Sequence, residues 1–215
     1  MVKYASQRFI YGDIAGVVTE EISKAGIITY LMEKNPWWND AIFHTIDWES
    51  VGLCMKKMTP QRVTNVVKMV HGWQHDGNQK YLFDDETEDS MCPTGCGQME
   101  EKLHFVTCQA PILVQAQHRR RDAFTLVHKK LRTATVIYTA LQSILNYLRV
   151  GGEEPTLALH YDSTFDRTLI MAWGEQRAIG WDQILKGRLS SGWGKAQDIY
   201  YRDNPYTSTK KHFSA

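Results

Sequence analysis

The chain has 215 residues, 43% of them hydrophobic, which is enough apolar material for one large packed domain or two small ones. Its 25 Lys and Arg nearly balance 24 Asp and Glu, and the formal net charge of +1 argues against a protein that coats nucleic acid with its whole surface. With no apolar run of about eighteen residues and no basic-then-apolar leader, we expect an intracellular protein, nuclear or cytoplasmic, with no membrane partner.

The first ninety residues read as an N-terminal helical region, residues 1–90. Apolar residues recur at helical spacing over residues 14–34, and Asn35-Pro36 ends that run before an aromatic-rich connector. A second helix is expected over residues 47–58, and its Cys54 is expected to lie in the protein core. Thr59-Pro60 starts a third helix that Gly72 ends. The acidic residues 84–89 predict a solvated loop.

The most specific pattern of the chain is a group of metal-ligand residue types in residues 91–108. Two pairs follow one another, Cys92-x3-Cys96 and His104-x3-Cys108. The first pair lies in a turn, where Gly95 and Gly97 supply conformational freedom. The second pair is expected on a helix over residues 98–108, where i,i+4 spacing puts both donors on one face. Four protein donors leave no open position, so the pattern predicts one structural Zn2+.

Two other interpretations of this pattern stay open at the level of sequence. The cysteines could be small buried hydrophobes, with His104 a core histidine. They could also form disulfides, which an intracellular setting disfavours.

The second half of the chain continues as helices. Pro111 opens a helix to Arg132, and a second helix is expected over residues 135–149; together they form a helical pair over residues 109–152. Gly151-Gly152 is the best candidate boundary. A C-terminal helical region, residues 153–203, has expected helices over 165–186 and 193–202 and a weak strand pattern over 157–161. Residues 204–215 are expected to be a disordered tail. The fold class is therefore mainly α, a helical domain with a small CCHC zinc-stapled turn-helix insert. The residues expected to face inward on the first two of these helices are Ala116, Ala123, Phe124, Val127 and Leu131, then Val136, Ile137, Ala140, Leu141, Ile144, Leu145 and Leu148.

One basic cluster follows the cysteine-rich segment. On a helix, three successive arginines fan over about 200°, so they cannot all face a core. Phosphate contact is the functional interpretation, and a solvated helix face is the alternative. The candidate nucleic-acid-binding residues are His118, Arg119, Arg120, Arg121, Lys129 and Lys130.

The order of motifs resembles the region downstream of the polymerase in retrotransposon reverse transcriptase polyproteins. Three stretches carry the resemblance. The first is Phe43-His44-Thr45-Ile46-Asp47-Trp48 with Arg62-x5-Lys68-x3-Gly72-Trp73, and the second is Cys92-Pro93-x2-Cys96-Gly97-x2-Glu100-x3-His104-x3-Cys108. The third is Gln176-x2-Ile179-Gly180-Trp181-x5-Gly187-Arg188-x4-Trp193-x3-Gln197. The turn departs from the family pattern, because it is Cys-x3-Cys where Cys-x2-Cys is usual.

What the resemblance implies is a non-catalytic, zinc-binding helical domain, since no polymerase core is present. Its partners would be element RNA or target DNA, or the polymerase portion of the same polyprotein. A protein-interaction scaffold without nucleic-acid binding is the alternative. A metal-dependent nuclease fragment is a weaker one, because Asp162, Asp166 and Glu175 lack the clustered pattern of a nuclease. The tryptophans Trp173, Trp181 and Trp193 favour core packing over stacking on bases.

Overall fold

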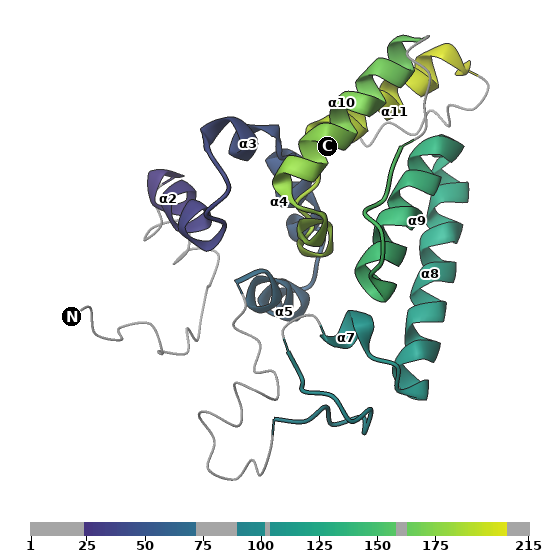
Figure 1. Cartoon of the computed structure of the whole chain (residues 1–215). Coiled ribbons are helices and arrows are strands. Elements are labelled where there is room, and N and C mark those ends of the chain that lie inside the picture. The colour runs from purple at the N-terminus through teal and green to yellow at the C-terminus, as the bar shows by residue number, and fades with distance from the viewer. Residues whose placement is uncertain (1–23, 72–89, 102–103, 158–162, 206–215) are drawn as a thin grey trace. The chain divides into compact units, whose positions relative to one another are not determined.

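The expected fold class is confirmed: the chain is mainly α and carries a Cys3His cluster. The computed structural model describes residues 24–71, 90–101, 104–157 and 163–205 (Figure 1). Within these ranges the only β pairing is two isolated antiparallel bridges, Ile46 with Ser190 and Met91 with Met99. Contacts divide the chain into two units, residues 1–44 and 45–215. None of the described helices is both long and apolar enough to cross a bilayer.

The first unit contains α2 (Lys24–Lys34) and most of α3 (Asp40–Thr45). Residues 14–23 of the expected first helix lie outside the described ranges. Helix α3 was not predicted, because the sequence indicated an aromatic-rich connector here. The sequence signal for this helix was Asn39, because asparagine is a favoured N-cap residue. In the structure its Oδ1 accepts the backbone N–H of Ile42 at 2.9 Å and so caps the first turn of α3.

The second unit begins with two helices close to the expected ones. Helix α4 (Trp48–Lys56) starts after Asp47, whose Oδ1 accepts the backbone N–H of Ser50 at 2.9 Å. Helix α5 (Pro60–His71) begins at the expected proline, whereas Gly72 and the acidic residues 84–89 lie outside the described ranges. The expectation for Cys54 was wrong, because this thiol is exposed on α4. Helical spacing predicts the period at which apolar residues recur along α4, but it does not predict which side of α4 other elements cover.

Helices α8 (Pro111–Leu131) and α9 (Thr135–Val150) have nearly the predicted bounds and lie side by side (Figure 1). The Thr125 hydroxyl meets the Tyr138 hydroxyl at 2.7 Å, and Phe124 stacks on the Tyr138 ring. The predicted inward face of α8 was wrong in part: Ala123, Val127 and Leu131 are exposed. On α9, Ile137, Ala140 and Ile144 are buried as predicted, whereas Val136 is exposed.

The main core of the second unit joins α9 to α10 (Thr164–Ile179), the 3-10 helix η1 (Trp181–Lys186) and α11 (Ser191–Asp203). The expected single helix over residues 165–186 is broken at Gly180, whose φ of 110° is unfavourable for other residues. Trp181 and Trp193 are buried in this core and Trp173 packs against it, so the core interpretation of these tryptophans holds.

A buried hydrogen-bond network links residues of the C-terminal motif that runs from Gln176 to Gln197. Gln176 is fully buried; its Nε2 donates to the carbonyl oxygens of Gly180 and Arg188, and its Oε1 accepts from Ser190 N–H and Trp193 Nε1. The spaced polar and glycine residues of this segment therefore hold α10, η1 and α11 together.

Candidate metal centre

The first two candidate ligands, Cys92 and Cys96, lie in a closed loop held by backbone pairing. Cys92 N–H donates to the Gln98 carbonyl at 2.8 Å, and Glu100 N–H donates to the Ser90 carbonyl at 2.9 Å, on either side of the Met91–Met99 bridge. Between these pairs the chain reverses through Gly95 and Gly97, at φ values of 73° and 76°. Residues other than glycine rarely adopt this region, so the two glycines permit the loop.

The second pair of ligands comes from a single helical turn. The predicted helix over residues 98–108 was wrong in extent, because α7 covers only His104–Thr107 and residues 98–100 pair with residues 90–92 instead. Helix propensity in this segment is overruled by a hairpin contact that local spacing does not reveal. The i,i+4 relation survives, since Cys108 N–H donates to the His104 carbonyl at 2.7 Å.

The structure brings all four predicted ligands together. The three sulfurs and the imidazole nitrogen lie within 4.8 Å of one another. Cys92 Sγ and Cys108 Sγ are 3.8 Å apart, and Cys96 Sγ is 3.1 Å from His104 Nε2. Cys92, His104 and Cys108 are buried and Cys96 is half-buried. Four convergent donors at these distances could hold one metal ion.

Hydrogen bonds around the sulfurs change their acidity in opposite directions. Burial raises the pKa of Cys92, but hydrogen bonds from the hydroxyl and the backbone N–H of Thr94, with smaller contributions from Cys96 and His104, lower it to about 6. Burial raises the pKa of Cys96, and the neighbouring Cys92 and Cys108 raise it further. A hydrogen bond from the Gln98 backbone N–H lowers this pKa in part, and the net effect is a raised pKa. The site therefore already stabilises one thiolate, the form that binds metal.

The cluster is fixed to the first turns of α8. Cys92 and Cys108 pack with Ala110, and Leu113 covers them. Gln117 Nε2 donates to the carbonyl oxygens of Val106 at 2.9 Å, Phe105 at 3.3 Å and Cys108 at 3.4 Å. Carbonyls at a helix end need such partners, so Gln117 joins the end of α7 to α8. Neither Thr94 nor Gln117 was predicted to belong to the site. For Thr94, the available signal in the sequence was a polar residue inside the Cys-x3-Cys turn.

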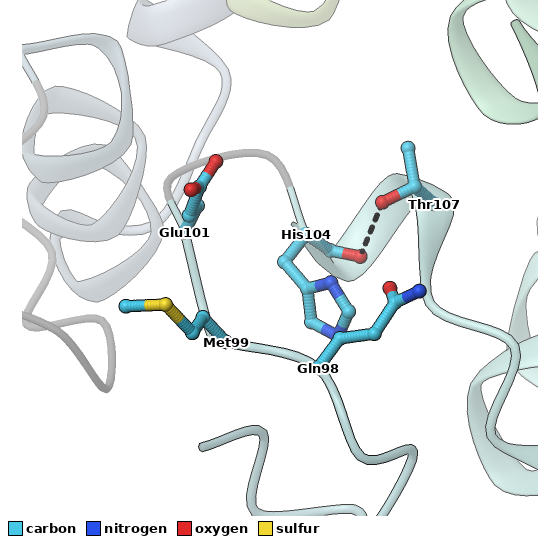
Figure 2. A pocket seen from close by; sticks show the side chains of 5 residues that line it. All are labelled: Gln98, Met99, Glu101, His104 and Thr107. Carbon is cyan, nitrogen blue, oxygen red and sulfur yellow. Dashed lines mark hydrogen bonds between the residues drawn. The ribbon is translucent and has the colours of Figure 1, made fainter. Parts of the chain in front are cut away.

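A pocket lies beside the cluster and shares His104 with it (Figure 2). Gln98 and Met99 line it from the second arm of the hairpin, Glu101 from just after that arm, and His104 and Thr107 from α7. The Thr107 hydroxyl donates to the His104 carbonyl at 3.3 Å, which ties this wall to the ligand-bearing turn.

The predicted basic residues all lie on α8 and are all exposed. The basic cluster begins with His118, directly after Gln117, and Arg121 Nη2 lies 3.0 Å from His118 Nδ1. Lys129 and Lys130 lie in the last turn of the same helix. The candidate nuclease carboxylates have structural partners: Asp166 bonds the Ser163 hydroxyl at 2.7 Å, and Glu175 accepts from the Ser190 hydroxyl. Asp162 lies outside the described ranges.

Comparisons with known proteins do not place the chain in a family. No family model matches it, no curated protein is significantly similar, and no solved structure matches its fold. The class that the fold and the cluster define is a helical protein with a Cys3His site able to hold a metal ion.

Proposed function

We propose that Cys92, Cys96, His104 and Cys108 bind one structural Zn2+. The observation that carries this proposal is the geometry of the four donors. In a tetrahedral zinc site with Zn–S near 2.3 Å, two sulfurs are about 3.8 Å apart, and a sulfur and an imidazole nitrogen about 3.5 Å. The distances here are 3.8 Å and 3.1 Å. Three thiolates and an imidazole suit zinc, and a fully occupied coordination shell suits a structural role.

Zinc content of the purified chain tests this proposal. We expect about one zinc per wild-type chain and a large loss in Cys108→Ala, which removes a fully buried ligand. Cys54→Ala is the matched control, because this cysteine is exposed and outside the cluster, and it should keep the metal. Wild-type chain without zinc, after preparation in its presence, would contradict the proposal.

We further propose that the chain is a non-catalytic domain of the retroelement polyprotein type, and that α8 contacts element RNA or target DNA. Support comes from the position of the basic cluster. Its six residues are exposed on one helix, and Gln117, directly before them, bonds the ligand-bearing segment. Zinc would thus hold the start of the basic helix in a fixed orientation, with phosphates as the contacted groups.

Charge reversal tests the nucleic-acid contact. Arg119→Glu combined with Arg120→Glu should lower affinity for RNA or DNA and reduce its dependence on salt concentration. Gln115→Glu, an exposed change on the same helix outside the cluster, serves as the control. Zinc-loaded wild-type chain that binds no nucleic acid at low salt would refute this part of the proposal.

A second candidate function, a protein-interaction scaffold, is favoured by a separate observation on α8. Leu126, Val127 and Leu131 are 68%, 50% and 43% exposed, which is unusual for three apolar residues in one helical turn and a half. A partner such as the polymerase portion of the same polyprotein would cover them. Leu126→Asp should then abolish association with that partner and leave nucleic-acid affinity nearly unchanged.

A further inference from the structure

Thr94 occupies an unusual position inside the Cys-x3-Cys turn. Its hydroxyl oxygen lies 2.9 Å from Cys92 Sγ and 3.5 Å from Cys108 Sγ. The residue is exposed, yet its side-chain oxygen reaches two ligand sulfurs that come from opposite ends of the metal-binding segment. Thr94, the middle of the three residues between Cys92 and Cys96, therefore brings a hydroxyl to the cluster.

A donor at this place has a clear electrostatic role. Three thiolates around a divalent cation leave the centre with a net charge of −1, and two of the sulfurs are buried beside Ala110 and Leu113. Buried charge is costly unless hydrogen-bond donors surround it. The Ala110 backbone N–H donates a hydrogen bond to Cys108 Sγ at 3.5 Å. A hydroxyl carries one proton, so Thr94 donates to one sulfur at a time, and the shorter distance selects Cys92.

We propose that Thr94 is a positioning residue of the metal centre, whose hydroxyl donates to the Cys92 thiolate, remains in reach of Cys108, and raises the affinity of the site for zinc. This inference rests on the proposed zinc site and adds a determinant outside the four ligands. Partners of ligand atoms typically change metal affinity by about 10-fold to 100-fold. Thr94 therefore acts through the sulfurs without itself binding the ion.

Three variants of the full chain test the inference. Thr94→Val keeps the shape and removes the hydroxyl, and we expect zinc affinity, measured by competition with a chromophoric chelator, to fall about 10-fold to 100-fold. Thr94→Ser keeps the hydroxyl and should stay within about threefold of wild type. Thr139→Val is the matched control, because Thr139 is exposed on α9 and outside the cluster, and it should also stay within about threefold.

Cobalt in place of zinc gives a readout that packing alone would not change. A thiolate that loses a hydrogen bond becomes a better electron donor, so the sulfur-to-cobalt charge-transfer band of Thr94→Val should move to longer wavelength, while Thr94→Ser keeps the wild-type band.

Two results would overturn the role of the hydroxyl. One is a Thr94→Val chain with wild-type zinc affinity and an unchanged cobalt band. The other is a Thr94→Ser chain that loses as much affinity as Thr94→Val, which would assign the effect to packing. Both leave the zinc site itself standing, whereas a wild-type chain that takes up no metal would overturn the zinc site and this inference together.

Discussion

Substitution of Gln176 by alanine should destabilise the second unit more than any surface change. The side chain is fully buried and makes four hydrogen bonds: Nε2 to Gly180 O at 3.3 Å and to Arg188 O at 3.2 Å, and Oε1 from Ser190 N at 3.0 Å and from Trp193 Nε1 at 3.2 Å. Alanine removes all four and leaves four groups of the core without these partners.

The size of the effect follows from this count. At about 1 kcal/mol for each lost hydrogen bond, the free energy of unfolding should fall by about 4 kcal/mol, with a small cavity adding to the loss. That is a large share of the roughly 5–15 kcal/mol of a folded domain. For a chain of this size it corresponds to a Tm lower by roughly 10 °C.

Urea unfolding, followed by helical circular dichroism at constant zinc concentration, measures this loss. Gln115→Ala is the control, because Gln115 is exposed on α8 and its substitution should change stability by less than about 0.5 kcal/mol. A loss below about 1 kcal/mol for Gln176→Ala would refute the assignment of this network as the element that joins α10, η1 and α11.

Three further outcomes are expected. Chelation of zinc should speed amide hydrogen exchange in residues 90–101 and 104–110 and leave α10 protected, because the cluster around Cys92 and Cys108 is separate from the main core. Gly95→Ala should lower zinc affinity about fivefold to tenfold in chelator competition, since its φ of 73° strains alanine, whereas Gly194→Ala on α11, where the added Cβ meets open space, should stabilise the chain slightly. His128→Phe should remove an acid sensitivity. Burial lowers the pKa of His128 from 6.5, so the unfolded chain takes up this proton first and wild-type stability falls as the pH drops below 6.5, which urea unfolding of both chains across this range would detect.

Each of these outcomes has a result that contradicts it. Equal acceleration of exchange in α10 on chelation would mean that the cluster and the main core unfold together. Gly95→Ala with unchanged zinc affinity would mean that the loop does not need the left-handed conformation to bind metal. A His128→Phe chain whose stability changes with pH in parallel with wild type would show that this imidazole does not stay neutral in the folded chain.

Much of this protein could be predicted from local sequence. The starts of α5 and α8 follow from Pro60 and Pro111, which fit the first position of a helix and depend on no distant contact. The start of α4 follows from Asp47, which is a favoured N-cap residue and likewise depends on no distant contact. The four candidate ligand positions were also evident, because soft donors in two pairs around glycine turns are a chemical pattern rather than a packing pattern.

The tertiary structure decided what depends on partners far along the chain. Helical spacing gave the period of α8 but not its covered side, so Val127 and Leu131 were assigned inward and are exposed. The helix expected before His104 became a hairpin because residues 98–100 find partners at residues 90–92. The Thr94 hydroxyl meets Cys108 across fourteen positions of sequence, and Gln176 meets Trp193 across seventeen. The sequence by itself therefore determined which four residues could form a metal site and most helix starts, since these rest on neighbouring residues. Burial and the hydrogen bonds around the candidate site arise only when distant segments pack.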